Sequence, residues 1–188
     1  MREFMSRVSP GLQSPSHLAP LPAVLDGFPH SGRRVIVSMP VQHGKTTVAC
    51  HAIAWWLTRE PGLSIVYASN AYAFAQRQSR VIRGLALQAG VELSAEHNTI
   101  GEWRTVQGGG LLATSVDGQL TGHRADVLVV DDPYKNREEA ESAEYRDKLT
   151  DWRRSVAMTR LPPDGAVMII ASRWPNPRHR SSRCGYLN

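Results

Sequence analysis

The sequence predicts an α/β fold, a three-layer sandwich in which helices flank a mainly parallel central sheet. Short apolar runs alternate with longer segments of helical periodicity, as strands and crossover helices do in a parallel sheet. The 188 residues are 41% apolar, which is enough for one domain with its own core. Only two cysteines are present, without a Cys/His cluster, so neither a disulfide framework nor a zinc site is indicated.

The first half of the chain predicts two strands, each followed by a helix. After a Pro-rich lead-in, the strands are Arg33–Ser38 and Ser64–Ala68, both short and apolar. The helix from Lys45 to Leu57 is apolar on nearly every side, as expected for a helix packed between layers. The second helix, from about Ala71 to Leu87, carries an apolar stripe formed by Phe74, Val81, Ile82 and Leu85.

The second half predicts a hairpin, two further strands and a polar helix. The hairpin spans Glu102–Ser115 around three consecutive glycines, and the strands are Val127–Val130 and Ala166–Ala171. The helix begins after the N-cap Asn136, which has Glu139 three residues on. Its expected apolar stripe is formed by Tyr145, Leu149, Trp152 and Val156. Residues 175–188 show neither period and are expected to be irregular.

Charge and hydropathy narrow the class of protein. No apolar run approaches the roughly 18–20 residues of a membrane-spanning helix, and the N-terminus lacks a signal-peptide core, so we expect a soluble protein of the cytoplasm without a membrane partner. The net charge is +5, most of it from four arginines near the end: Arg173, Arg178, Arg180 and Arg183. Such a tail is either solvated or attracted to backbone phosphates.

The strongest local signal is the segment Ser38–Thr47, between a predicted strand and a predicted helix. Loops at this position bind nucleotide phosphates through backbone N–H groups, with a lysine on the β- and γ-phosphates and a hydroxyl on Mg²⁺. Lys45 and Thr46 suit those roles, and Gly44 lets the backbone approach closely. The standard pattern has glycine where this chain has Met39, so the motif alone also fits a plain turn with a solvated lysine.

A pair of acids follows the predicted strand Val127–Val130. Hydrolysis of ATP or GTP needs a carboxylate at the end of a buried strand to hold the hydrated Mg²⁺, and commonly a second one to orient the attacking water. We assign Asp131 to the metal and Asp132 to the water. The alternative is that the two acids merely begin a surface turn.

Several segments together resemble one family. They are residues 38–46, 118–126 (Gly-Gln-Leu-Thr-Gly-His-Arg-Ala-Asp), 129–136 (Val-Val-Asp-Asp-Pro-Tyr-Lys-Asn), 151–152, 159–161 and 169–174 (Ile-Ile-Ala-Ser-Arg-Trp). In order and spacing they resemble the large subunit of the terminase of tailed bacteriophages, the ATP-driven motor that packages DNA. The similarity runs from about His17 to Trp174, and the loop without a first glycine resembles that family's version.

The resemblance implies a P-loop NTPase of the ASCE type, with ATP and Mg²⁺ as cofactors. It also implies double-stranded DNA, a terminase small subunit and the capsid portal as partners, and assembly into a homo-oligomeric ring in the bacterial host. The nucleotide-binding residues implied by the loop are Gln42, His43, Gly44, Lys45, Thr46 and Thr47.

Four residues outside the loop also receive roles from the resemblance. His17 is the candidate for contact with the adenine. Ser172 and Arg173, at the end of the last strand, would couple hydrolysis to movement. Arg124, which follows Thr121-Gly122-His123, is the candidate arginine supplied from a neighbouring subunit to stabilise charge on the transferred phosphoryl group.

The end of the sequence departs from the family pattern. Family members continue into an RNase H-like nuclease, whose carboxylates this chain lacks, so no nuclease activity is expected of it. We expect a lead-in at residues 1–30, an ATPase domain at 31–174 and an irregular basic tail at 175–188. Two alternatives stay open: a truncated prophage remnant without catalytic activity, and a helicase-like nucleic-acid-dependent ATPase.

Overall fold

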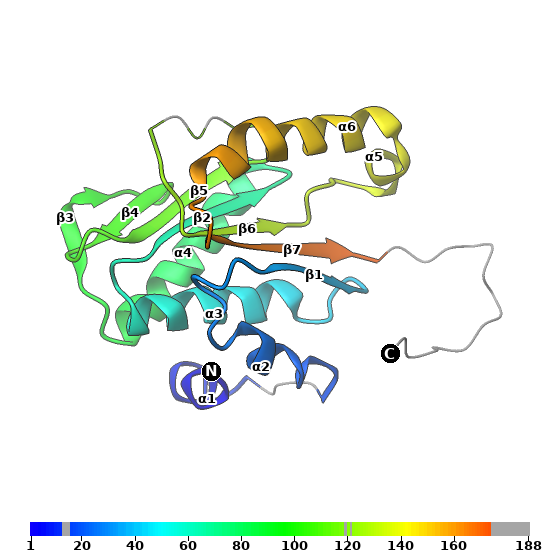
Figure 1. The fold of residues 1–188 in the computed structure, drawn as a ribbon. Helices are drawn as coiled ribbons and strands as arrows, with labels where there is room; N and C mark the ends of the chain where they lie inside the picture. The colour runs from blue at the N-terminus through cyan, green and yellow to red at the C-terminus, as the bar shows by residue number, and fades with distance from the viewer. Residues whose placement is uncertain (13–15, 119, 121, 174–188) are drawn as a thin grey trace.

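A central sheet divides the molecule into three layers. A computed structural model describes residues 1–12, 16–118, 120 and 122–173, and within them the sheet has seven strands in the order β1-β7-β6-β2-β5-β4-β3 (Figure 1). The first five in that order run parallel, whereas β4 and β3 are antiparallel to their neighbours. The strands are β1 (Arg34–Met39), β2 (Ser64–Ser69), β3 (Leu93–Asn98), β4 (Glu102–Thr105), β5 (Gly110–Ser115), β6 (Val127–Asp131) and β7 (Ala166–Ser172). The predicted fold class is confirmed.

Helices cover both faces of this sheet. In Figure 1, α3 and α4 lie on one side and α5 and α6 on the other, and α1 and α2 pack beyond α3. The α-helices are α1 (Arg2–Val8), α2 (Leu21–Leu25), α3 (Lys45–Arg59), α4 (Tyr72–Gln88), α5 (Arg137–Glu141) and α6 (Ala143–Trp152). There are also short helical turns at Ser16–Leu18, Arg153–Ala157 and Met158–Arg160.

Side chains of the buried strands point alternately to the two faces of the sheet and so form the two halves of the core. Successive side chains of a strand point to opposite faces of the sheet. Tyr67 of β2 and Val129 of β6 therefore join the cluster beneath α3 and α4. Their neighbours Val66 and Leu128 join the cluster beneath α6, together with Trp152. Because both faces are covered, these strands read as continuous apolar runs in the sequence.

The sequence prediction missed or misplaced several features. Strand β3 was not predicted, because it is polar and largely exposed. Val81 was expected inside but is 46% exposed, since it lies about 100° around α4 from the fully buried Ile82. The predicted polar helix is interrupted at the extended residue Ser142, and Tyr145, beyond this break, is 44% exposed. The predicted cap is confirmed: the Asn136 side chain accepts a hydrogen bond from the Glu139 N–H.

The lead-in shares the core of α3. The Trp56 indole on α3 donates to the Leu25 carbonyl over 3.0 Å, and its ring stacks on Phe28 at 5.4 Å. Leu18 is buried in the same cluster. The predicted boundary near residue 30 therefore separates segments of sequence that pack against one another. Residues 175–188, the predicted tail, lie outside the described residues.

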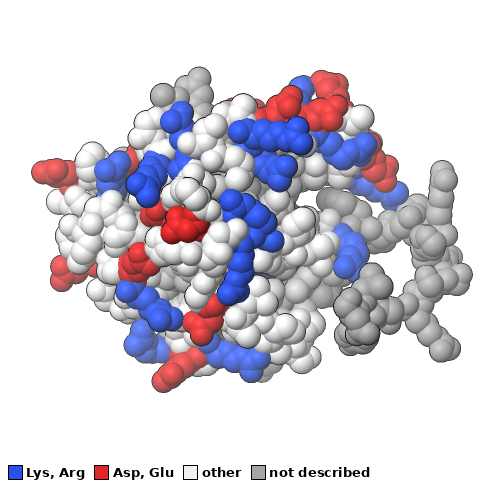
Figure 2. Space-filling model, in the orientation of Figure 1, with Lys and Arg blue, Asp and Glu red and all other residues white. Residues whose placement is uncertain are grey.

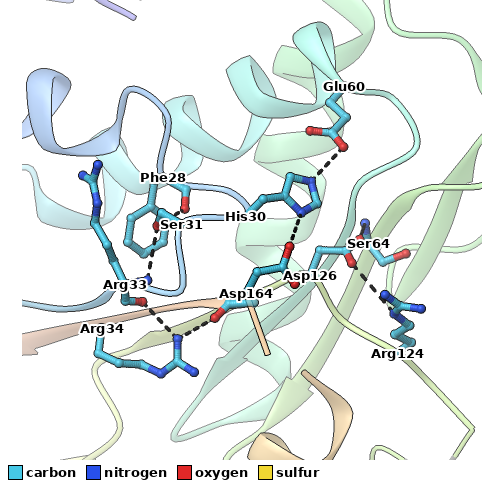
Figure 3. A network of polar contacts seen from close by, with 11 residues as sticks. Phe28, His30, Ser31, Arg33, Arg34, Glu60, Ser64, Arg124, Asp126 and Asp164 are labelled. Atoms are coloured by element: carbon cyan, nitrogen blue, oxygen red, sulfur yellow. Dashed lines mark hydrogen bonds and ion pairs between the residues drawn. The ribbon is translucent and has the colours of Figure 1, made fainter. Parts of the chain in front are cut away.

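A polar network closes the amino edge of the sheet (Figure 3). His30 Nε2 lies 2.8 Å from Glu60 Oε1, and its Nδ1 lies 3.6 Å from Asp164 Oδ2. The hydrogen bond to Glu60 raises the pKa of His30. Arg34, at the start of β1, donates to the Gly165 carbonyl just before β7. The network ties the lead-in, the end of α3 and the turn before β7 together.

Replacing Gly109 by alanine is expected to lower the free energy of unfolding by about 1–3 kcal/mol. A Cβ there would meet the backbone of Pro61, Gly62 and Leu63 closer than real Cβ atoms come, so the chain must shift. Gly84→Ala is the matched control: it lies within α4 with open space around its Cβ position, so a gain of about 0.5–1 kcal/mol is expected. Urea titration measures both; equal effects would contradict the packing described for Gly109.

Candidate nucleotide-binding site

The loop between β1 and α3 is shaped for close approach of a ligand to the backbone. Gly44 has a φ of +78° at the N-cap of α3, and Gln42 has a φ of +62° at the exposed turn of the loop. A Cβ on Gly44 would lie 3.1 Å from Leu18 Cδ1, in addition to the strain of its left-handed backbone. The loop thus opens onto the N-terminus of α3, where backbone N–H groups attract anions.

Lys45, the first residue of α3, turns back over this loop. Its side-chain nitrogen donates to the carbonyls of Met39 and Pro40, over 3.3 and 3.0 Å, and to Ser172 Oγ over 3.2 Å. All three acceptors are neutral oxygens, and Lys45 is only 6% exposed. Among the described residues it forms no salt bridge. A buried ammonium held only by neutral groups can serve an anionic ligand.

Asp131 ends β6 beside this lysine and is fully buried. The Tyr67 hydroxyl donates to its Oδ2 over 2.5 Å. Burial raises the pKa of Asp131; Tyr67, Thr46 and the Lys45 charge act in the opposite direction. The structure therefore brings Lys45, Thr46 and Asp131 together at the carboxyl edge of the sheet.

Tyr67 was not predicted as a site residue. Burial, and then the charge of Asp131, raise the pKa of Tyr67 well above its ordinary value, so its hydroxyl stays protonated and acts as the donor. Nothing in the sequence distinguishes Tyr67 from the other residues of its apolar strand. Only the pairing of β2 with β6 places it beside Asp131.

Asp132 follows in an unusual backbone conformation, with a φ of +42°. Its N–H donates to the Ile170 carbonyl over 2.9 Å, and its own carbonyl accepts from the Asn70 side chain over 2.7 Å. These bonds from the neighbouring strand ends hold a conformation that costs a non-glycine residue free energy, of a kind concentrated at functional sites. Asn70 was likewise not predicted.

The carboxyl edge of the sheet has oxygen atoms of the kind that a hard cation requires. Three buried oxygens of the described residues have no hydrogen-bond partner: Ser69 Oγ, Asp131 Oδ1 and Asp132 Oδ1. Ser69 and Asp131 are register partners on β2 and β6. No cluster of three or more His, Cys, Asp or Glu occurs in the part of the chain that is described. Magnesium is commonly held by one or two carboxylates, waters and substrate phosphates, so these residues fit it.

Ser172 and Arg173 lie at the same edge, because β7 pairs with β1. Met39 and Ser172 are register partners, which brings Ser172 to Lys45. The Arg173 N–H donates to the Met39 carbonyl over 2.8 Å, and its guanidinium reaches the Ser38 carbonyl at 3.5 Å. Ser172 therefore contacts the first residue of α3, and Arg173 contacts the end of β1.

His17 lies at the outer side of the loop. Its Nε2 is 3.1 Å from the His43 carbonyl oxygen, and the two imidazole rings meet edge to face at 5.2 Å. His43 Nδ1 is itself 2.8 Å from the Val41 carbonyl oxygen. Thr47 is exposed, and its carbonyl lies 2.7 Å from His51 Nδ1. The lead-in thus forms one side of the loop.

Arg124 lies apart from this group. It precedes β6 at the amino edge of the sheet, where its guanidinium is 4.0 Å from Asp126 Oδ1 and 76% of its side chain is exposed (Figure 3). Strand β6, which rises about 3.3 Å per residue and so spans roughly 13 Å, separates Arg124 from Asp131 at the carboxyl edge. It does not reach the loop of its own chain.

Comparison with known proteins identifies the family of this chain. The family described as "Terminase large subunit, T4likevirus-type, N-terminal" matches residues 36–175, which is well over half of the chain. The chain belongs to the terminase large subunit family. No curated protein sequence matches the chain. The match includes the loop at Lys45 and both acids of the pair.

A solved structure shows the same fold. A mutant of the large terminase ATPase domain from Thermus phage P74-26 aligns over 94% of this chain and 72% of its own, with a TM-score of 0.56 and 16% identity. A second structure of that ATPase domain aligns over 88% of this chain and 72% of its own, with a TM-score of 0.49 and 18% identity. The first likeness supports the fold of this terminase chain. No described helix has the length and apolar character required to span a membrane.

Proposed function

We propose that this chain is the ATP-hydrolysing motor domain of a phage terminase large subunit, which drives double-stranded DNA into the procapsid. The observation that carries the proposal is the convergence of Lys45, Thr46, Asp131 and Ser172, from two parallel strands and one helix, at a single edge of the sheet. Membership of the terminase family supports the link to packaging. The proposed partners are DNA, the small subunit, the capsid portal and further copies of the chain in a ring, in the host cytoplasm.

Each site residue receives a role from its position. Lys45 would leave its neutral acceptors for the β- and γ-phosphates, and the loop N–H groups would bind the remaining phosphate oxygens. Thr46 and Asp131 would hold Mg²⁺, which neutralises phosphate charge when bound. Asp132 would orient the attacking water and accept its proton.

The neighbours of the phosphate loop suggest how hydrolysis is sensed. Ser172 is hydrogen-bonded to Lys45, so a change at the γ-phosphate that draws Lys45 away frees the hydroxyl at the end of β7. We assign Ser172, with Arg173, to coupling between hydrolysis and movement. We assign His17, which lies at the outer side of the loop against His43, to contact with the base of the nucleotide.

The direct test is phosphate release by the purified chain with ATP and Mg²⁺, with and without duplex DNA. Turnover stimulated by DNA is expected. A folded chain that shows no turnover under either condition would instead support the inactive prophage remnant. Strand separation on a forked duplex would favour the helicase-like alternative over packaging.

Arg124→Ala is expected to lower turnover about 10²-fold, with nucleotide binding unchanged. The physical reason is position: Arg124 is far from its own loop but exposed, so it serves the loop of an adjacent copy. Mixing Arg124→Ala with Lys45→Ala chains should restore turnover that neither has alone, because one supplies an intact loop and the other the arginine. Phosphate release measures both effects.

The control for this experiment is Arg80→Ala, an exposed arginine on α4. It should leave turnover unchanged and should not complement Lys45→Ala. Full activity of Arg124→Ala on its own would remove the assignment of Arg124.

A further inference from the structure

The hydroxyl of Tyr67 is hydrogen-bonded to one oxygen of the buried Asp131 carboxylate and leaves the other without a partner. We propose that Tyr67 is a positioning residue for the metal site: by holding Asp131 Oδ2, it leaves Oδ1 as the one carboxylate oxygen offered to a divalent cation. This inference rests on the proposed function, because it assumes that Asp131 meets a nucleotide-bound cation.

The sheet register produces the contact. Tyr67 is the register partner of Val129, and side chains two residues apart on a strand point to the same face. Asp131 therefore lies on the face of Tyr67, one step closer to the carboxyl edge. The long phenol spans that step, and the resulting 2.5 Å hydrogen bond has the length typical of a hydroxyl donating to a carboxylate.

Packing alone does not explain this tyrosine. Its ring is completely buried in the cluster beneath α3 and α4, where phenylalanine would fill nearly the same space. The hydroxyl adds a polar group to that core, and its hydrogen bond within the described residues is the one to Asp131. A buried hydroxyl with a single carboxylate partner is suited to fixing the orientation of that carboxylate.

The second oxygen of the Asp131 carboxylate is the one that a cation could reach. Asp131 Oδ1 is buried without a hydrogen-bond partner. Rotation about the Cβ–Cγ bond of an aspartate is broad. A half-turn only exchanges two equivalent oxygens, so what the tyrosine fixes is the plane of the carboxylate; without it, that plane can swing away from the one that presents an oxygen to the loop. Partners of ligating carboxylates commonly contribute 10- to 100-fold to metal affinity by preventing such disorder.

The test is a titration of Mn²⁺, followed by the electron paramagnetic resonance signal of the free ion, into protein with saturating ADP. Tyr67→Phe is expected to weaken Mn²⁺ binding about tenfold or more relative to the native chain. Binding of ADP in excess EDTA should be unchanged, because the substitution leaves the loop and Lys45 intact. Tyr72→Phe, an exposed tyrosine on α4, is the matched control and should bind Mn²⁺ like the native chain.

A double-substitution cycle separates positioning from a general loss of structure. In an Asp131→Asn background, Tyr67→Phe should have no further effect on Mn²⁺ affinity, because the oriented carboxylate is already absent. Equal Mn²⁺ affinity of Tyr67→Phe and the native chain would overturn the inference. So would an equal loss of metal-free ADP binding, which would mark Tyr67 as structural. Failure of the native chain to retain Mn²⁺ with ADP would instead count against the proposed function.

Discussion

A Lys45→Ala chain is expected to lose ATP turnover by about 10³-fold. In the structure the ammonium is hydrogen-bonded to two backbone carbonyls and the Ser172 hydroxyl, and it forms no salt bridge among the described residues. It is therefore available for the phosphates, where charge develops during transfer. Alanine removes that charge, and only water could then donate hydrogen bonds to the three acceptors. Phosphate release at saturating ATP measures the loss.

The fold should survive this substitution. A buried ammonium adds little to stability, because removing it from water is costly and its acceptors here are neutral. Circular dichroism and the thermal midpoint should stay close to those of the native chain. Lys135→Ala, an exposed lysine four residues after Asp131, is the control and should turn over ATP normally. Unchanged turnover by Lys45→Ala would remove the lysine from the reaction.

Asp132→Asn should lower turnover about 10³–10⁴-fold while nucleotide binding is spared. Asparagine keeps the size and shape of the side chain but cannot accept a proton from water. Asp132 Oδ1 is buried without a hydrogen-bond partner, beside Asp131, as expected of an oxygen kept for a ligand water. Single-turnover phosphate release measures the chemical step.

Binding is measured separately, from the fluorescence of an ADP analogue carrying a dye on its ribose. Asp147→Asn, an exposed aspartate on α6, is the matched control and should change neither quantity. A loss of binding equal to the loss of turnover would show that Asp132 holds the nucleotide and does not orient water. Asparagine should also keep the left-handed backbone of residue 132, so the thermal midpoint should not change.

Much of the fold could be predicted, and the candidate site residues could be located, because their signals are local. Strand β6 is a continuous apolar run ending in Asp131, and the phosphate loop is one segment of ten residues. Both segments can be recognised from their own residues, without information from elsewhere in the chain. The individual roles assigned to Lys45, Thr46 and the acids stay predictions until the substitutions are made.

The remaining contributors could not be predicted because they depend on pairing between distant strands. Tyr67 and Asn70 reach the acids only through the alignment of β2 with β6, more than sixty residues apart. Strand β3 has no apolar alternation, since it lies at the outer edge with most side chains in water. Arg124 has a plausible motif position, but only the sheet shows that it lies at the edge opposite the loop.

That opposition of Arg124 and the phosphate loop limits how copies of the chain can cooperate. Two copies related by a twofold axis place identical surfaces together, whereas an arginine on one side and a nucleotide on the other require head-to-tail stacking. If Arg124 serves a neighbouring copy, as proposed above, an open pair leaves one of its two nucleotide sites without the arginine, whereas a closed ring supplies every site. Turnover per chain should therefore climb steeply with protein concentration and level off once the circles are complete.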